Sequence, residues 1–219
     1  SFNSRDLALH AKDQKNLNNE SFVKIIQKDP DSLSTIMICT KDRANVFATI
    51  IGILDSENIN FLDAKLFGMK NGFCLDFITI SNQAGEVISN NSSVAKSLAI
   101  RLKEALDQEI LSPKIVKRRQ PKHLKHFNTD TIIKYKHDMT HRWTEVDIKT
   151  SDRPGLLASI CQVFLDHGAL IRKARIATYG ERAEDKFCIT SKENTPYLKK
   201  KDLERLINDM SVSLSGANK

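Results

Sequence analysis

The sequence is poor in glycine and lacks the loops that bind nucleotides. Its 219 residues include eight glycines, and none of them falls in a Gly-x-Gly-x-x-Gly or P-loop pattern. Such loops need glycine because backbone amides must approach phosphate groups closely. We therefore expect no nucleotide chemistry, no catalytic residue and no cofactor in this chain.

Cysteine is also scarce, and its spacing excludes the common metal and redox motifs. Four cysteines stand singly in apolar runs, without a Cys-x-x-Cys pair. They are expected to be buried thiols in a reducing compartment. No apolar run approaches the roughly 18 residues of a membrane span, and the chain does not open with an export signal. The sequence thus predicts a cytoplasmic protein without a membrane partner.

The positive charge is modest and concentrated in one stretch. Lysine and arginine exceed aspartate and glutamate by 34 to 27, which gives a net charge of +7. Much of this excess lies in residues 114–126, whereas both signs are mixed elsewhere, as on an ordinary solvated surface. A nucleic-acid partner is not expected on this ground alone.

An internal repeat organises most of the chain. The pair Asp42-Arg43 recurs as Asp152-Arg153, 110 residues later, and the match runs without a gap for some thirty positions. In both copies a strand with alternating apolar residues precedes a helix whose apolar residues form one stripe. The stripe comprises Val46, Phe47, Ile50, Ile51 and Leu54 in the first copy, and Leu156, Leu157, Ile160, Cys161 and Phe164 in the second.

Each copy continues with a hairpin, a second helix and a short closing strand. The closing strands are predicted at residues 114–117 and 211–215, and residues 132–136 are predicted as an extra strand before the second copy. The order β, α, β, β, α, β, found twice, predicts an α+β fold of two ferredoxin-like domains in tandem. Residues 1–30 are expected to form a helical stub, 31–118 the first domain, and 119–219 a basic linker with the extra strand and the second domain.

The turn after the opening strand is the candidate binding site. In the second copy it reads Asp152, Arg153, Pro154, Gly155, Leu156, Leu157. Free amides at a helix start attract negative or polar groups, and glycine allows close approach to the backbone. From these residues alone, an ordinary capped turn with Asp152 as the N-cap is the favoured interpretation.

The segment Asp152 to Ala158, together with Gly180-Glu181-Arg182 and Asp185, resembles the ACT domain family. More narrowly, the two copies resemble the C-terminal ACT pair of the bifunctional uridylyltransferase and uridylyl-removing enzymes, which modify the PII nitrogen-signalling protein. The resemblance covers most of residues 34–215. It implies an ACT-type regulatory fragment in nitrogen metabolism, joined to catalytic domains that are absent here and that are expected to need a divalent metal.

What the resemblance further implies is allosteric regulation by glutamine or a related amino acid, bound at the turn from Asp152 to Leu157. A weaker second site would lie at Asp42, Arg43, Asn45 and Val46, where Ala44-Asn45 replaces Pro-Gly. PII would be an indirect partner. Since ACT sheets commonly pair at their edges, the two copies are expected to pair within one chain or between chains as a homodimer.

Three alternatives stay open at this stage. The ACT pair could serve another amino-acid enzyme or act as a stand-alone sensor. An RNA-binding module has the same element order, but it needs exposed aromatic residues on central strands, and here the phenylalanines are expected to pack in the core. Four histidines at 123, 126, 137 and 141 suggest a metal, yet their places in a linker and a turn favour solvated side chains, so no metal ligand is assigned.

Overall fold

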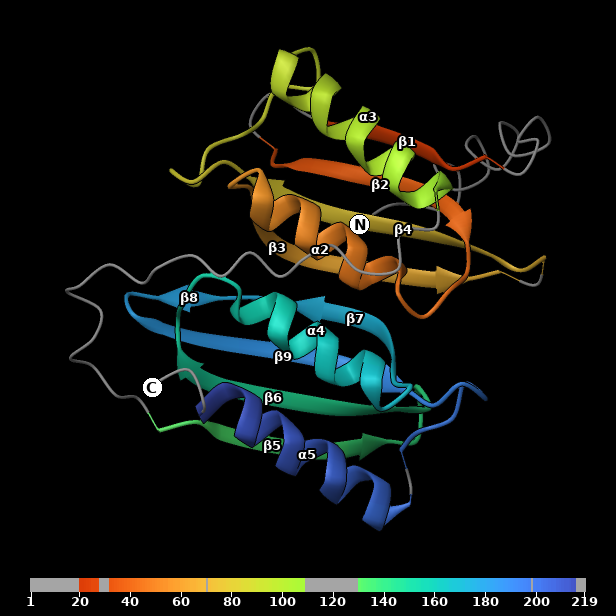
Figure 1. The fold of residues 1–219 in the computed structure, drawn as a ribbon, viewed down its shortest axis with the longest axis vertical. Coiled ribbons are helices and arrows are strands. Elements are labelled where there is room, and N and C mark those ends of the chain that lie inside the picture. Colours follow the sequence, from red (N-terminus) through yellow and green to blue (C-terminus); the bar gives the residue numbers. More distant parts are fainter. Residues whose placement is uncertain (1–19, 28–31, 70, 109–129, 198, 216–219) are drawn as a thin grey trace.

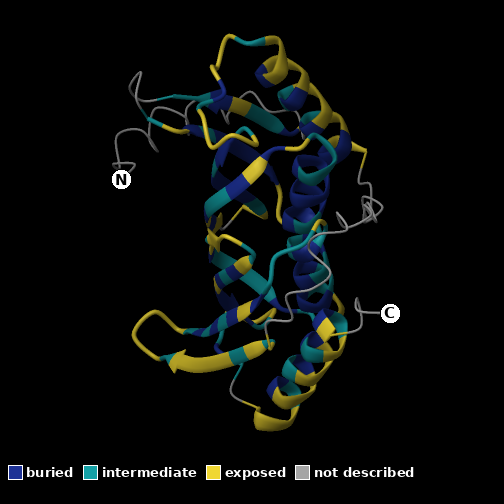
Figure 2. Cartoon of the chain, turned by 90° about the vertical axis from the view of Figure 1, so that its left-hand side faces the viewer, coloured by how far each residue is buried: buried dark blue, intermediate teal, exposed yellow. Residues whose placement is uncertain are grey.

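The computed structural model describes residues 20–27, 32–69, 71–108, 130–197 and 199–215. In this part of the chain the strands form one antiparallel sheet, and the helices pack against one of its faces (Figure 1). Figure 2, turned by 90°, shows the helices as one layer beside the sheet, with buried residues where the two layers meet. The fold is therefore α+β with two layers.

The first unit has the order β, β, α, β, β, α. Its elements are β1 (Phe22–Ile26), β2 (Ser34–Lys41), α2 (Val46–Ser56), β3 (Asn60–Gly68), β4 (Phe73–Ser81) and α3 (Ser93–Asp107). The apolar stripe predicted for α2 is buried under the sheet. Asn58, in the left-handed conformation with φ 58°, lets the chain leave α2 and enter β3.

The second unit repeats this order with one added short strand, Thr178–Tyr179. Its elements are β5 (Ile132–Asp138), β6 (Trp143–Ser151), α4 (Leu156–Asp166), β7 (Leu170–Arg175), β8 (Thr178–Tyr179), β9 (Arg182–Thr190) and α5 (Lys200–Ser215). The predicted extra strand is confirmed as β5, which pairs with β6 through a tight hairpin. Gly168, with φ 65°, ends α4 as Asn58 ends α2.

The two units join through strands β3 and β7. The strand order is β1-β2-β4-β3-β7-β9-β6-β5, with β8 paired to β9, and all pairings are antiparallel. At the junction Ala64 lies opposite Ala174, its own counterpart in the repeat. Because equivalent residues face each other, the units are related by an approximate twofold axis through this pair. The copies thus pair within the chain.

Two sequence predictions about the ends of the units are wrong. Residues 22–26, predicted as part of a helical stub, form the strand β1, and residues 211–215, predicted as a closing strand, are the last turn of α5. The strand beside each opening strand is therefore supplied from upstream, by β1 and β5. The other closing strand, at 114–117, the stub residues 1–19 and the domain boundary at 118 lie outside the described residues.

The helix-free face of the sheet differs between the units. In the first it carries a buried apolar cluster of Met37, Cys39, Leu75 and Phe77. At the equivalent positions of the second unit stand charged residues, which form the ion pairs Lys186–Asp147 and Lys149–Glu184. Phe61 and Phe187 pack in the core against Phe47 and Phe164, respectively, as predicted for the phenylalanines, whereas Phe67 is exposed.

No helix among the described residues is long and apolar enough to cross a membrane. The four cysteines are free and buried, as their apolar sequence surroundings predict.

Candidate functional site

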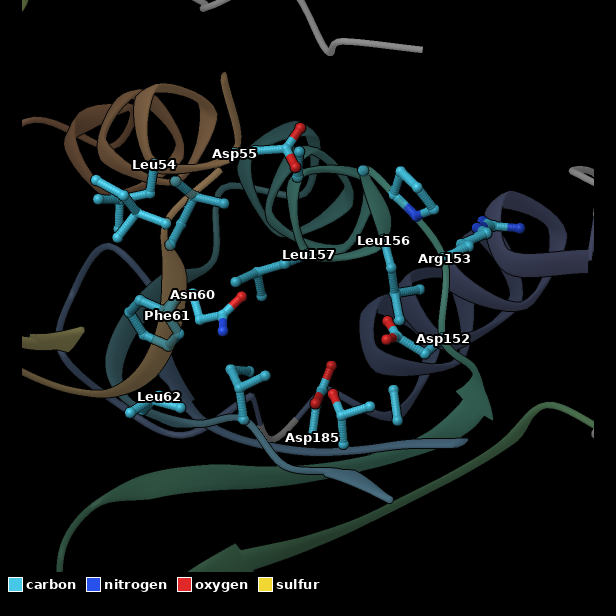
Figure 3. Close-up of a pocket in the computed structure, with 18 residues that line it drawn as sticks. Leu54, Asp55, Asn60, Phe61, Leu62, Asp152, Arg153, Leu156, Leu157 and Asp185 are labelled. Atoms are coloured by element: carbon cyan, nitrogen blue, oxygen red, sulfur yellow. The ribbon is translucent and has the colours of Figure 1, made fainter. Parts of the chain in front are cut away.

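A cavity of about 430 Å³ lies at the junction of the two units (Figure 3). The turn from Asp152 to Leu157 forms one wall, and the end of α2 with the start of β3 forms the facing wall. Residues from β9, among them Asp185, form the floor. The volume lies within the range of small-molecule sites, and the cavity exists only because β3 and β7 bring the units together.

The wall formed by the predicted turn is the start of helix α4. Gly155 is its N-cap residue and has φ 76°, a left-handed conformation that glycine adopts without strain. The Leu156 amide donates to the Arg153 carbonyl oxygen at 3.1 Å, and the amides directly after it have no acceptor within the helix and can donate to a ligand. The amide of Asp152 donates to the Glu181 carbonyl oxygen at 2.8 Å, which fixes the turn on the neighbouring hairpin.

Three aspartates line this cavity, Asp55 on the facing wall and Asp152 and Asp185 on the side of the predicted turn. Asp185 is 3% exposed, and its Oδ1 atom has no hydrogen-bond partner among the described residues. Burial raises the pKa of Asp185 to about 7, the amide of Ala177 opposes this shift, and the charge of Asp152 adds to it. Burial raises the pKa of Asp152 as well. Asp152 accepts a hydrogen bond from the Arg153 amide, and the helix cap is Gly155 rather than Asp152.

Arg153 borders the cavity but directs its guanidinium away from it. Its Nη1 and Nη2 atoms donate to the carbonyl oxygens of Leu214 and Ser213, at 3.1 and 3.2 Å. These carbonyls belong to the last turn of α5, where a cation is favoured by the helix dipole. In Figure 3 the side chain points toward that helix. The contacts give Arg153 a structural role, and its part in ligand binding stays a prediction.

The first copy of the turn lies in an equivalent position on the other side of the twofold axis. Asp42, Arg43 and Val46 line a much smaller space there, of about 40 Å³. Arg43 donates through Nη2 to the Leu106 carbonyl oxygen at 2.6 Å, as Arg153 does to the end of α5. Asn45, at the position of Gly155, has φ −89° and is right-handed. The weaker site predicted at this turn therefore has little room for a ligand.

Sequence reasoning missed the facing wall of the large cavity. Asp55, Asn60 and Leu62 belong to the first unit, and nothing in the motif around Asp152 points to them. The repeat itself held a usable signal, because at these three positions the second unit has Leu165, Leu170 and Arg172, so the copies differ where the two cavities differ.

Of the histidines considered as metal ligands, His137 and His141 lie in the described part and His123 and His126 do not. His137 bonds Thr144 at 3.0 Å, and His141 pairs with Asp138 and stacks on Trp143. Among the described residues no three His, Cys, Asp or Glu side chains are grouped so that they could hold a metal ion. The divalent metal expected of the longer enzyme has no donor set within these residues.

Comparison with known proteins finds bifunctional uridylyltransferase/uridylyl-removing enzymes among the relatives of this chain. A bifunctional uridylyltransferase/uridylyl-removing enzyme from Psychrobacter sp. is 37% identical over 155 residues, which is 71% of this chain and 17% of that enzyme. The corresponding enzyme of Pseudomonas fluorescens is 34% identical over 79% of the chain and 19% of its own length, and that of Acinetobacter baumannii 35% identical over 74% and 18%.

The chain is homologous to the C-terminal region of bifunctional uridylyltransferase/uridylyl-removing enzymes. It spans less than a fifth of the length of these three relatives. No protein-family model matches it.

Two solved structures align with most of the chain but at low similarity. A putative glycine cleavage system transcriptional repressor is 14% identical, covers 84% of this chain and 91% of its own, and has a TM-score of 0.29. An unknown protein from Galdieria sulphuraria is 13% identical, covers 90% and 93%, and has a TM-score of 0.26. These scores are too low to bear on how the units are arranged.

Proposed function

We propose that this chain is the amino-acid-sensing regulatory region of a PII uridylyltransferase/uridylyl-removing enzyme, and that glutamine is its ligand. The observation that carries the proposal is the cavity between the units, which has the Asp152 to Leu157 turn as one wall. Homology to the uridylyltransferases supports the host enzyme. The ACT resemblance of the turn supports an amino acid as the ligand.

The cavity offers both kinds of group that an amino acid needs. Amides at the start of α4 suit the carboxylate, because the positive end of the helix dipole lies there. The carboxyl groups of Asp152 and Asp185 suit the ammonium group. The described residues bring no catalytic constellation to this cavity, and the chain is proposed to act on catalytic domains elsewhere in the longer enzyme.

Ligand binding would regulate the catalytic domains of the longer enzyme by changing how the two units pair. The two walls of the cavity belong to different units, so a ligand that contacts both walls favours one arrangement of the junction between β3 and β7. A coupling of about 1–3 kcal/mol is typical of such a switch. PII is then an indirect partner, through the catalytic domains. The buried free thiols are consistent with a reducing, cytoplasmic setting.

The alternative is that this chain regulates a different enzyme or acts alone. An ACT-type module of another amino-acid enzyme, or a stand-alone sensor, would present the same ammonium and carboxylate contacts, since every free amino acid carries both groups. Only the homology distinguishes the uridylyltransferase from these hosts.

Titration calorimetry of the whole chain with glutamine tests the proposal, with glutamate and asparagine as matched ligands. We expect saturable heat with glutamine and a weaker response with the other two. Glutamate differs from glutamine only in lacking the side-chain amide, and asparagine differs only in the length of the side chain. Equal affinity for all three would contradict glutamine specificity. Heat with none of them would refute the proposed ligand.

A further inference from the structure

Because the twofold axis through Ala64 and Ala174 relates the two units, each residue position in the large cavity has an equivalent position in the small one. The large cavity has Asp152 and Asp185, and the small one has their counterparts Asp42 and Asp76. Each space therefore contains the same pair of carboxyl groups. What differs are the side chains that the opposite unit brings: the large cavity has Asp55 and Leu62 where the small one has Leu165 and Arg172.

In the small cavity the opposite unit brings a cation, Arg172. A Cβ atom placed on Gly68 would lie 3.0 Å from Asp42 Oδ2 and 3.5 Å from Arg172 Nη1, so both groups flank the same point. Burial raises the pKa of Asp76 to about 7, and its Oδ1 atom, like that of Asp185, has no hydrogen-bond partner among the described residues; the guanidinium charge of Arg172 acts against this pKa shift. The Nε atom of Arg172 donates to Thr190 Oγ1 at 3.1 Å, and its Nη2 atom donates to Asn194. Arg172 is thus held in place beside the two carboxyl groups.

In the large cavity the residue at the position of Arg172 is Leu62, which carries no charge. Of the described residues that line this cavity, only Arg153 is cationic, and it bonds the end of α5 instead. Asp185 is almost fully buried with Oδ1 unpartnered, and Figure 3 shows its carboxyl group directed into the cavity. A buried carboxylate without a partner is unfavourable, and a cation beside it removes the penalty.

We propose that the large cavity binds the ammonium group of its amino-acid ligand between Asp185 and Asp152, and that Arg172 occupies the equivalent place in the small cavity, so each chain binds one ligand. The inference rests on the proposed function in taking an amino acid as the ligand, and it adds the recognition group and the stoichiometry. The ligand supplies the cation that the large cavity lacks.

The test compares matched substitutions at equivalent positions, with glutamine as the probe in calorimetry. Asp185→Asn keeps the shape but removes the charge, and we expect at least about tenfold weaker binding, the usual effect of losing a charge-assisted hydrogen bond. Asp76→Asn makes the same change in the small cavity and should leave the affinity within about twofold of the original. The expected stoichiometry is one glutamine per chain.

A second substitution fills the large cavity with the group found in the small one. Leu62→Arg places a guanidinium beside Asp185 and should abolish glutamine binding. It should also lower the pKa of the Asp185 carboxyl in an NMR titration, a readout that needs no ligand. N-acetylglutamine, which lacks the ammonium group, should bind the unaltered chain at least about tenfold more weakly than glutamine.

The outcomes separate this inference from the proposed function. If glutamine binds but Asp185→Asn and N-acetylation leave the affinity unchanged, or if two molecules bind, the inference is overturned and the glutamine sensor stands. If another free amino acid binds in an Asp185-dependent manner and glutamine does not, the sensor ligand is wrong and the inference stands. If none of the standard amino acids binds, both are refuted.

Discussion

Asp185 illustrates, at the scale of a single residue, how burial changes an ordinary side chain. Its carboxyl group has one oxygen without a hydrogen-bond partner among the described residues, and Asp152, Asp55 and Cys161 are the titratable groups from the elements that pack around it. Burial and the charge of Asp152 both disfavour ionisation. The folded protein therefore holds this proton more tightly than the unfolded chain does.

This difference predicts a pH dependence of stability. The pKa of Asp185 is 3.8 in an exposed carboxyl and about 7 in the folded chain, so the folded state binds more protons between these values. The free energy of unfolding should then fall as the pH rises from about 4 to about 7, by about 1.4 kcal/mol per unit of pKa difference. Asp185→Asn should be no more stable than the original at pH 4 and more stable at pH 8.

Urea unfolding at the two pH values measures this effect. Asp147→Asn, on the helix-free face and in an exposed ion pair, serves as a control that should not gain stability at pH 8. An unchanged pH profile in Asp185→Asn would mean that water reaches the carboxyl group.

The residues of the site were predictable only in part. The turn from Asp152 to Leu157 carries its own signal, because a strand, a glycine and an apolar helix stripe follow one another in sequence. Asp55 and Asn60 carry no such signal, since they become site residues only when the first unit pairs with the second. Arg153, predicted as a ligand contact, makes its hydrogen bonds with α5, and no local pattern indicates a contact sixty residues away.

At the scale of elements, helices α2 and α4 and the strands around them were predicted because their apolar periods are clear. Two short segments were mistaken. Residues 22–26 have apolar spacing that fits a helix or a strand, and the β-branched side chains and pairing with β2 favour the strand. Val212 and Leu214 alternate as in a strand, yet Leu214 continues the buried helical series of Leu206 and Met210.

The arginine of each turn connects elements that are far apart in sequence, and this predicts an effect on stability. Arg153→Gln should lower the free energy of unfolding by about 1–3 kcal/mol, because the last carbonyls of α5 lose charge-assisted donors. Arg182→Gln, which breaks an exposed ion pair with Glu184, is the control and should cost less than about 0.5 kcal/mol. Urea unfolding measures the free energy of unfolding of both variants. If Arg153→Gln instead weakens glutamine binding without lowering stability, Arg153 contacts the ligand rather than stabilising α5.

At the scale of the whole molecule, the pairing of β3 with β7 builds the cavity from two walls that belong to the same chain. The affinity for glutamine should therefore be the same over two orders of magnitude of protein concentration, since no second chain has to associate. Equilibrium dialysis with labelled glutamine at both ends of the range measures this. An affinity that weakens on dilution would show that a second chain completes the site. The outer strand β5 carries Lys134 and Lys136, charges that discourage further edge pairing.

The twofold arrangement also affects how the two cavities can change over time. In a dimer of identical chains, one substitution in the gene appears at both sites, so closing one cavity closes the other. Here leucine at position 62 and arginine at position 172 are encoded separately, although they occupy equivalent places. A duplicated chain can keep one site open for a ligand while the other becomes a fixed internal contact, and it retains the symmetric scaffold that positions both.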